Sequence, residues 1–209
     1  MPNLASRFAT AVDNALDLAV AGEQARVLLS NRGIGAQPLS VSKLEMLYEM
    51  AYLRIFIHWE IFLEETFLRY ACGYASASGT ATMLSGVFYP SLAVAQAAVY
   101  RGNAYILWHN PSTIITRVKR DLYNGLHEQV ISSNQYRLEH FAHIRHRIAH
   151  GQEDARRKFD LATMSLSARR YPGARPGRFL RDWDIQTTPQ RWLDVIAAEL
   201  KSLSVQITP

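Results

Sequence analysis

The feature that most constrains this chain is the long apolar and aromatic run LEMLYEMAYLRIFIHWEIFLEETFLRYACG, which begins at Leu44 and reaches Gly73. Ser40 or Ser42 can cap a helix at its start, and Glu45 follows Ser42 by three residues, as in a capping box. Gly73 is a residue at which such a helix stops. A helix of about eight turns needs other elements to cover its apolar surface, so we expect a helical bundle around it.

The first part of the chain predicts another helix, from about Asn3 to Leu29. Its apolar residues recur at spacings of four, which is the stripe of an amphipathic helix. They are Leu4, Phe8, Val12, Leu16 and Val20. The segment NRGIGAQP, residues 31–38, then interrupts the helical pattern.

Two shorter helices are predicted in the middle of the chain. The first covers residues 91–102, SLAVAQAAVYRG, and the second covers residues 110–126, NPSTIITRVKRDLYNGL. Asn110 or Ser112 can cap the second helix, and Pro111 suits its first turn because proline already has a helical φ angle.

The last third of the chain predicts two more helices. Residues 133–151 have the pattern of a helix of about five turns that ends at Gly151, where glycine can adopt the left-handed conformation. Residues 188–203 predict the final helix, capped by Thr187 or Thr188.

Together these segments predict an all-α fold, a helical bundle with a long basic loop or a small hairpin before the last helix. Residues 73–86 are small and polar and predict a connector, and residues 179–186, FLRDWDIQ, can form a short strand. We expect a single domain over residues 1–209, in which residues 1–39 form the N-terminal helix and linker and residues 40–203 form the core.

The composition argues against a secreted or membrane protein. Cys72 is the single cysteine, which excludes an intramolecular disulfide framework and a zinc site of several cysteines. The N-terminus has no basic start followed by an apolar core, and no stretch approaches about 18 uncharged apolar residues. We therefore expect a cytoplasmic protein without a membrane partner.

The positive charge is concentrated in one region, residues 156–181. The chain has a formal net charge of +5, and this region holds eight basic residues against one acid, Asp160. The basic residues are Arg156, Arg157, Lys158, Arg169, Arg170, Arg175, Arg178 and Arg181. Such a region is either a solvated, flexible loop or a surface that contacts phosphate groups.

Arg145 is the charge that the late helix places where apolar residues are expected. On a helical wheel it falls inside an arc formed by Leu138, Phe141, Ala142, Ile144, Ile148 and Ala149. A buried, unpaired guanidinium would cost several kcal/mol, so a partner must satisfy it. One interpretation is a structural salt bridge to Glu60, Glu64 or Glu65. The other is a two-pronged donor for phosphate at a cleft or subunit interface.

Four histidines lie on another stripe of the same helix. His140, His143, His146 and His150 fall within about 120° of one another together with Arg147, facing away from the apolar arc, which predicts an exposed basic stripe. Histidines at such spacings can share a metal ion, but no carboxylate or cysteine pattern completes a zinc site and the motif HExxH is absent. We expect no metal and no cofactor.

The segment IRHRIAHG, residues 144–151, resembles the RxxxxH signature of the HEPN superfamily, which often ends in Ala-His-Gly at a helix terminus. The preceding aromatic helix with IHWEIFLEETF fits that context. The stretch AYILWHNPSTIITRVKRDL is similar to the segment before the signature in the RiboL-PSP-HEPN-like group. The resemblance spans roughly Leu44 to Leu203.

This resemblance implies a helical bundle that forms a homodimer, with two signatures facing each other across a cleft, and a metal-independent endoribonuclease. Arg145 and His150 match the invariant catalytic pair. His146 stands where the family commonly has Asn or another polar residue, so we expect an auxiliary role for it. A toxin or antiviral defence effector, controlled by an antitoxin or another regulatory protein, is the corresponding biological role.

The expected chemistry is cleavage of RNA through its 2′-hydroxyl. Histidine can take the 2′-hydroxyl proton, and arginine can stabilise the charge of the phosphorane. Residues expected to hold RNA are Arg147, Arg156, Arg157, Lys158, Arg169 and Arg170, and those expected to orient the catalytic arginine are Glu60 and Glu64. The alternatives are a catalytically idle HEPN-like binding or dimerisation module and a metal-dependent helical enzyme.

Overall fold

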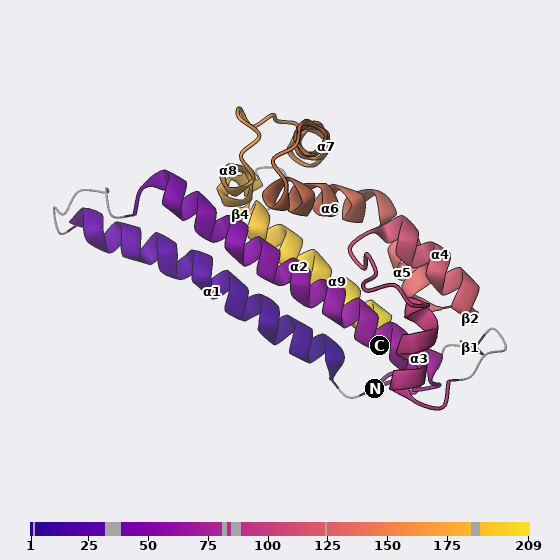
Figure 1. The fold of residues 1–209 in the computed structure, drawn as a ribbon. Coiled ribbons are helices and arrows are strands. Elements are labelled where there is room, and N and C mark those ends of the chain that lie inside the picture. Colours follow the sequence, from indigo (N-terminus) through magenta and orange to yellow (C-terminus); the bar gives the residue numbers. More distant parts are fainter. Residues whose placement is uncertain (2, 32–38, 81–82, 85–88, 124, 185–188) are drawn as a thin grey trace. The chain divides into compact units, whose positions relative to one another are not determined.

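A computed structural model describes residues 1, 3–31, 39–80, 83–84, 89–123, 125–184 and 189–209 (Figure 1). Over these residues the chain is predominantly α-helical, which confirms the predicted fold class. The helices are α1 (Leu4–Asn31), α2 (Val41–Ala71), α3 (Leu92–Tyr100), α4 (Pro111–Asp121), α5 (Leu126–Ser133), α6 (Gln135–Ala149), α7 (Glu153–Ser167), α8 (Pro176–Arg181) and α9 (Trp192–Ile207).

Two short antiparallel strand pairs accompany the described helices. β1 (Met83–Leu84) pairs with β2 (Leu122–Tyr123), and β3 (Trp183–Asp184) pairs with β4 (Gln190–Arg191), placing Trp183 opposite Arg191. The second pair lies directly before α9, where a small hairpin was one of the two predictions.

The long helix α2 forms where its sequence predicts it. The backbone N–H of Lys43 lies 3.4 Å from Ser40 Oγ, so Ser40, and not Ser42, caps the helix. Gly73 follows α2 with a φ of 82°, a left-handed conformation that glycine adopts without steric cost. Cys72, just before it, is buried, and burial raises the pKa of its thiol.

The buried residues of α1 recur with the 3.6-residue period of the helix and not at the predicted spacing of four residues. Leu4, Phe8 and Val12 are buried as expected, but Val20 is 49% exposed. Ala15 and Ala19 take over the buried positions. Because an α-helix has 3.6 residues per turn, a strict spacing of four rotates by about 40° at each step and leaves the buried face after a few turns.

The structure differs from the predicted late helix at both of its ends. Asn134 separates α5 from α6, so α6 begins at Gln135, and it ends at Ala149. The predicted left-handed glycine is wrong, because Gly151 has no positive φ angle.

The helix predicted over residues 110–126 is also shorter than expected, since α4 ends at Asp121. Asn110 caps it as expected, with Thr113 N 3.3 Å from Asn110 Oδ1.

The predicted long basic loop is largely helical. Glu153–Ser167 form α7 and Pro176–Arg181 form α8. Acids in the first turn of α7 and bases one turn later stabilise this helix. The strand predicted over residues 179–186 is confined to Trp183–Asp184 among the described residues. The predicted caps Thr187 and Thr188, like residues 32–38, lie outside the described part of the chain.

Contacts divide the chain into two compact units. Unit 1 consists of residues 1–9, 58–139 and 200–209, and unit 2 consists of residues 10–57 and 140–199. Four of the described helices, α1, α2, α6 and α9, contribute residues to both.

The core of unit 1 is aromatic around the second half of α2. Phe8 packs against Trp59 and Phe62, with ring centroids 5.6 Å and 5.5 Å apart. Next to this cluster lies a buried polar pair, in which His127 Nε2 is 2.7 Å from Thr66 Oγ1.

In unit 2, α1 and α2 lie side by side (Figure 1), and the Tyr48 hydroxyl donates to Glu23 at 3.1 Å. The buried Tyr52 hydroxyl of α2 donates to the carbonyl of Phe141 in α6 at 2.8 Å, which fixes α6 against α2. The core of this unit therefore holds the helix that carries the HEPN-like signature.

Gly177 sets the distance between α8 and α2. Its N–H donates to Glu49 Oε1 at 2.8 Å, and a Cβ built at this position would overlap the carbonyl oxygen of Glu45 and lie 2.6 Å from the carbonyl carbon. Because both atoms belong to the backbone, the overlap can be relieved only by moving a helix. We expect Gly177→Ala to lower the free energy of unfolding by about 3 kcal/mol, measured by urea denaturation.

Gly151→Ala is the matched control for this prediction. A Cβ at Gly151 meets nothing within 4 Å, and its φ is not positive, so its free energy of unfolding should stay within about 0.5 kcal/mol of the parent value. Equal urea midpoints for the two variants would show that α8 does not depend on this close approach.

Candidate functional site

The predicted catalytic residues lie at the junction between α6 and α7. Arg145 and His146 belong to the last turns of α6 and are partly buried, whereas His150 follows the helix and is exposed. The backbone N–H of His150 donates to the backbone carbonyl of His146 at 2.9 Å, which continues the helical hydrogen-bond pattern by one residue. The two imidazole rings consequently lie close together, with centroids 4.6 Å apart and planes at 50°.

The charges around this pair favour a neutral His146. Burial is the largest cause that lowers the pKa of His146, followed by the nearby charges of His150, Lys158 and Arg145, while Asp154 acts in the opposite direction. A neutral imidazole at His146, with the His150 ring and two cationic side chains beside it, can serve acid–base chemistry on an anionic substrate.

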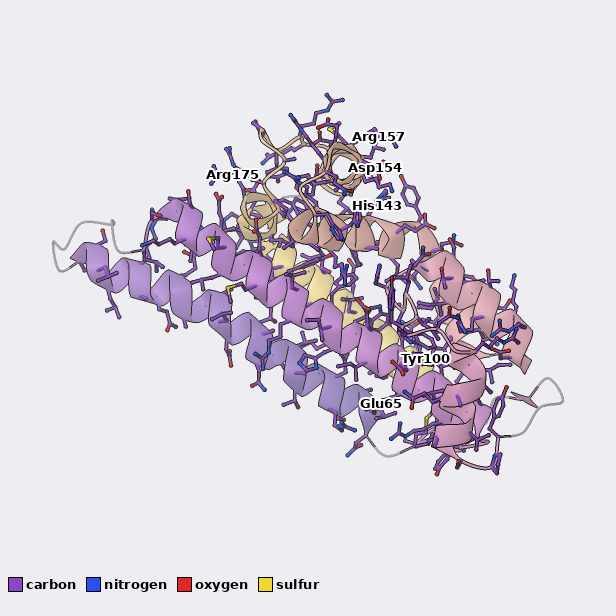
Figure 2. The ribbon with its side chains drawn as sticks, viewed as in Figure 1. Glu65, Tyr100, His143, Asp154, Arg157 and Arg175 are labelled. Atoms are coloured by element: carbon purple, nitrogen blue, oxygen red, sulfur yellow. The ribbon has the colours of Figure 1, made fainter. Side chains whose placement is uncertain are left out.

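The first turns of α7 hold three of the predicted RNA contacts beside acids of the same helix. Asp154 pairs with Lys158 Nζ at 2.6 Å and with Arg157 Nη2 at 3.0 Å, and these partners lower the pKa of its exposed carboxyl. Arg156 lies 3.9 Å from Glu153. Asp154 and Arg157 both project from α7 in Figure 2. These pairs offset part of the positive charge that the basic region offers to phosphate.

Arg147 holds the turn that carries His150. Its Nε donates to the carbonyl of Ala174 at 3.1 Å, and its Nη1 donates to the carbonyl of His150 at 3.4 Å. The side chain predicted to contact RNA thus connects the turn after α6 with the loop before α8.

The other two predicted RNA contacts follow α7. Arg169 pairs with Asp182 at 3.4 Å, and both side chains are partly solvent-exposed. Arg170 is exposed and borders a hollow of about 470 Å³ along α7. The other residues lining this hollow are Glu153, Asp154, Arg157, Asp160, Leu161 and Met164.

The predicted exposed histidine stripe is wrong for most of its members. His140 is 8% exposed, and His143 and His146 are partly buried, so only His150 is exposed. The prediction from the helical wheel requires a single buried face, but α6 is at least partly buried at nearly every position. Ala149, predicted to face inward, is exposed because it lies at the helix end.

No metal centre stands out at these histidines. Among the described residues, no group of three or more His, Cys, Asp or Glu side chains is arranged to hold a metal ion. Within the same residues, no helix combines the length and apolar character needed to cross a membrane.

The acids considered as partners of Arg145 have contacts within unit 1. Glu60 Oε1 lies 3.2 Å from His109 Nδ1, and Glu64 accepts a 2.6 Å hydrogen bond from the Tyr100 hydroxyl. The pairing of Arg145 with either acid stays a prediction.

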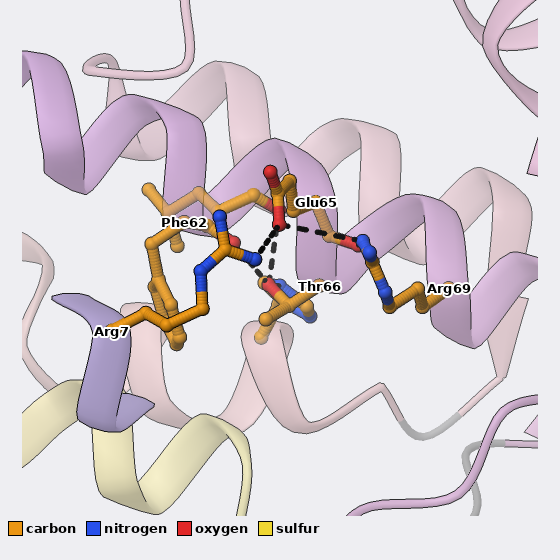
Figure 3. Close-up of polar contacts among 7 residues, drawn as sticks. Arg7, Phe62, Glu65, Thr66 and Arg69 are labelled. Carbon is orange, nitrogen blue, oxygen red and sulfur yellow. Dashed lines mark hydrogen bonds and ion pairs between the residues drawn. The ribbon is translucent and has the colours of Figure 1, made fainter. Parts of the chain in front are cut away.

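Glu65 lies between two arginines. Its Oε2 is 3.5 Å from Nη1 of both Arg7 and Arg69, and dashed lines in Figure 3 mark the two ion pairs. This carboxylate connects α1 to α2 within unit 1, which is a structural role.

Asp154 is the residue of this junction that sequence reasoning missed. It lies in the first turn of α7, three and four residues before Arg157 and Lys158, a spacing that signals ion pairs along a helix. The signal lies within the region predicted to be a basic loop.

A scan of protein-family models gives no match for this chain, and searches of curated proteins and of solved structures give none either. The likeness to HEPN domains therefore depends on the residues of the signature and on their setting.

Proposed function

We propose that this chain is a metal-independent, HEPN-type endoribonuclease that uses Arg145 and His150. The observation that carries the proposal is the grouping at the α6–α7 junction: the rings of His146 and His150 lie 4.6 Å apart, and Arg145 and Lys158 are near enough to lower the pKa of His146. Paired imidazoles beside fixed cations suit cleavage of a phosphodiester without a metal.

In this mechanism His150 accepts the proton of the RNA 2′-hydroxyl. The 2′-oxygen then attacks phosphorus, and the bond between phosphorus and the 5′-oxygen breaks. A protonated imidazole, His150 of a second copy, returns a proton to that oxygen. The products are a 2′,3′-cyclic phosphate and a 5′-hydroxyl, and Arg145 stabilises the extra negative charge of the phosphorane. His146, kept neutral, supplies a hydrogen-bonding group beside His150.

A homodimer is supported by apolar side chains that the single chain leaves uncovered. Met46, Met50 and Ile57 of α2 are 59%, 55% and 53% exposed, and their spacing of four and seven residues places them on one side of the helix. Exposed apolar surface of this kind is typical of interaction sites.

A biological role as a toxin or antiviral defence effector follows from the same proposal. Such an enzyme would act in the cytoplasm, where RNA is present and a lone thiol such as Cys72 stays reduced. Because free ribonuclease activity damages its own cell, an antitoxin or regulatory protein is the expected partner.

The test is cleavage of RNA in the presence of EDTA. Purified protein is incubated with total cellular RNA and with an end-labelled single-stranded oligomer, and the cleaved ends are identified by mass spectrometry. We expect fragments that end in 2′,3′-cyclic phosphate, and no cleavage at a position carrying a 2′-deoxyribose. Cleavage that stops with EDTA, or that leaves 5′-phosphates, would contradict the mechanism.

The second candidate is a catalytically idle HEPN-like module that binds nucleic acid or a protein. The ion pairs of Asp154 with Lys158 and Arg157 favour it, because they use within α7 the charges that a substrate would need. Binding of diverse RNAs with all of them left intact would select this function.

A further inference from the structure

Unit 2 contains a second, more strongly charged hollow, apart from the residues of the α6–α7 junction. It has a volume of about 620 Å³, within the range of small-molecule sites. Its lining comes from the start of α2, from Arg169 after α7, from α8 with the residues next to it, and from the strand pair before α9. The residues are Val41, Glu45, Arg169, Arg175, Arg178, Arg181, Asp182, Trp183 and Arg191.

Positive charge dominates this arginine hollow. Five guanidinium groups face two carboxylates in its lining. A third carboxylate, Glu23, is shared by Arg181 and Arg191, with Oε1 2.8 Å and 3.0 Å from their nitrogens. Even with all three acids ionised, an excess of two positive charges remains, which favours an anionic occupant.

The arginines differ in how much of their hydrogen-bonding capacity is used. Arg175 pairs with Glu45 and Arg169 pairs with Asp182 at 3.4 Å. Arg178 is exposed, and within the described residues its side chain has no ion pair or hydrogen bond. Its guanidinium is therefore available to grip a phosphate through two parallel hydrogen bonds.

The hollow also has an aromatic side. Trp183 is 49% exposed, and the guanidinium of Arg191 lies 4.8 Å from its ring centroid. A tryptophan stacked with arginine presents a flat, polarisable surface on which a nucleobase can stack. A simple anion such as phosphate would make no use of this surface.

Arg191 and the backbone of Trp183 are held in place before any ligand arrives. Arg191 Nη1 donates to the carbonyl of Arg181 at 2.6 Å, and the pairing of β3 with β4 sets Arg191 opposite Trp183. The backbone N–H of Trp183 donates to Asp182 Oδ1 at 3.0 Å. Binding would still have to order the exposed side chain of Arg178, whereas Arg191 is already held.

We propose that the arginine hollow binds a phosphorylated nucleotide unit, with the phosphate on Arg178 and Arg169 and the base on Trp183. The unit is either a free nucleotide or the 5′-phosphorylated end of an RNA strand. This binding does not require RNA cleavage, so the proposal stands independently of the catalytic one.

The test compares four ligands by isothermal titration calorimetry on the full chain: AMP, inorganic phosphate, a 5′-phosphorylated single-stranded RNA tetramer with 2′-O-methyl groups, and the same tetramer with a 5′-hydroxyl. The 2′-O-methyl groups prevent cleavage through the 2′-oxygen. We expect the 5′-phosphorylated tetramer or AMP to bind at least 10-fold more tightly than inorganic phosphate. The tighter of the two identifies the source of the nucleotide, and equal affinity of the two tetramers would exclude the RNA end.

Two variants locate the site. Arg178→Gln should weaken nucleotide binding about 10-fold, whereas Arg54→Gln, a change of another exposed arginine of unit 2, should alter it less than about twofold. Trp183→Ala should weaken AMP but not inorganic phosphate. Equal effects of Arg178→Gln and Arg54→Gln, or an AMP affinity insensitive to Trp183→Ala, would overturn the proposal.

Discussion

Replacing His150 by alanine is expected to lower the rate of RNA cleavage at least 100-fold, because general acid–base catalysis by a placed side chain contributes about 10² to 10⁴. His150 is exposed, so the substitution removes little packing and the urea midpoint should not change. The measurement is the initial rate on an end-labelled oligomer, with parent and variant at equal concentration.

Gln152→Ala is the control for His150→Ala. Gln152 is exposed in the same turn and caps α7 without a side-chain hydrogen bond, so its removal should change the rate less than about threefold. If His150→Ala keeps more than a tenth of the parent rate, the catalytic base lies elsewhere, and His146 is the next residue to replace.

The second large effect concerns acid stability and His127. This side chain is fully buried, and burial lowers its pKa from 6.5 to about 3. The Thr66 hydroxyl lies 2.7 Å from the carbonyl of Phe62, to which it donates, so it accepts the proton of His127 Nε2 (Figure 3 shows Thr66 and Phe62). His127 is thereby held as the neutral tautomer with its proton on Nε2.

The direction of the pH effect follows from the two pKa values of His127. Above pH 6.5 the histidine is neutral in both the folded and the unfolded chain, and it adds no pH dependence. Below pH 6.5 the unfolded chain binds a proton that the folded chain does not bind until about pH 3. The free energy of unfolding therefore falls as the pH falls, by about 1.4 kcal/mol per unit and by about 5 kcal/mol over the whole window.

Urea denaturation between pH 7.5 and 4.5 tests this prediction against His127→Gln. Glutamine can place its Nε2 donor near Thr66 but does not titrate. The parent should lose about 3 kcal/mol more than the variant over that range. Parallel curves for the two proteins would show that His127 is protonated, or exposed to solvent, in the folded chain.

Local sequence rules predicted some elements because the deciding interactions are near in sequence. Ser40, the run after it and Gly73 contain the start, body and end of α2, and Asn110 caps α4 through a residue three positions away. The helix α7 was not predicted, because Arg157 and Lys158 were interpreted as part of a charged loop, whereas their pairs with Asp154 stabilise the helix.

Some features of the candidate site could likewise be predicted from the sequence, and others depend on the tertiary fold. The proximity of His146 and His150 follows from a spacing of four on a helix, so the sequence alone suffices for it. The burial of His140 depends on elements that pack around α6, and the wheel of one helix contains no information about them. The arginine hollow joins Val41 to Arg191, and only the tertiary fold brings such distant residues together.

The lone thiol of Cys72 makes it possible to follow one part of this molecule separately. Trp59 and Trp108 lie in unit 1 and Trp183 and Trp192 lie in unit 2, so tryptophan fluorescence mixes the signals of both. Cys72 belongs to unit 1, and a buried thiol with a raised pKa reacts slowly with alkylating reagents until its surroundings open. The rate at which Cys72 is alkylated, measured by mass spectrometry, therefore reports the opening of unit 1 alone and needs no engineered probe.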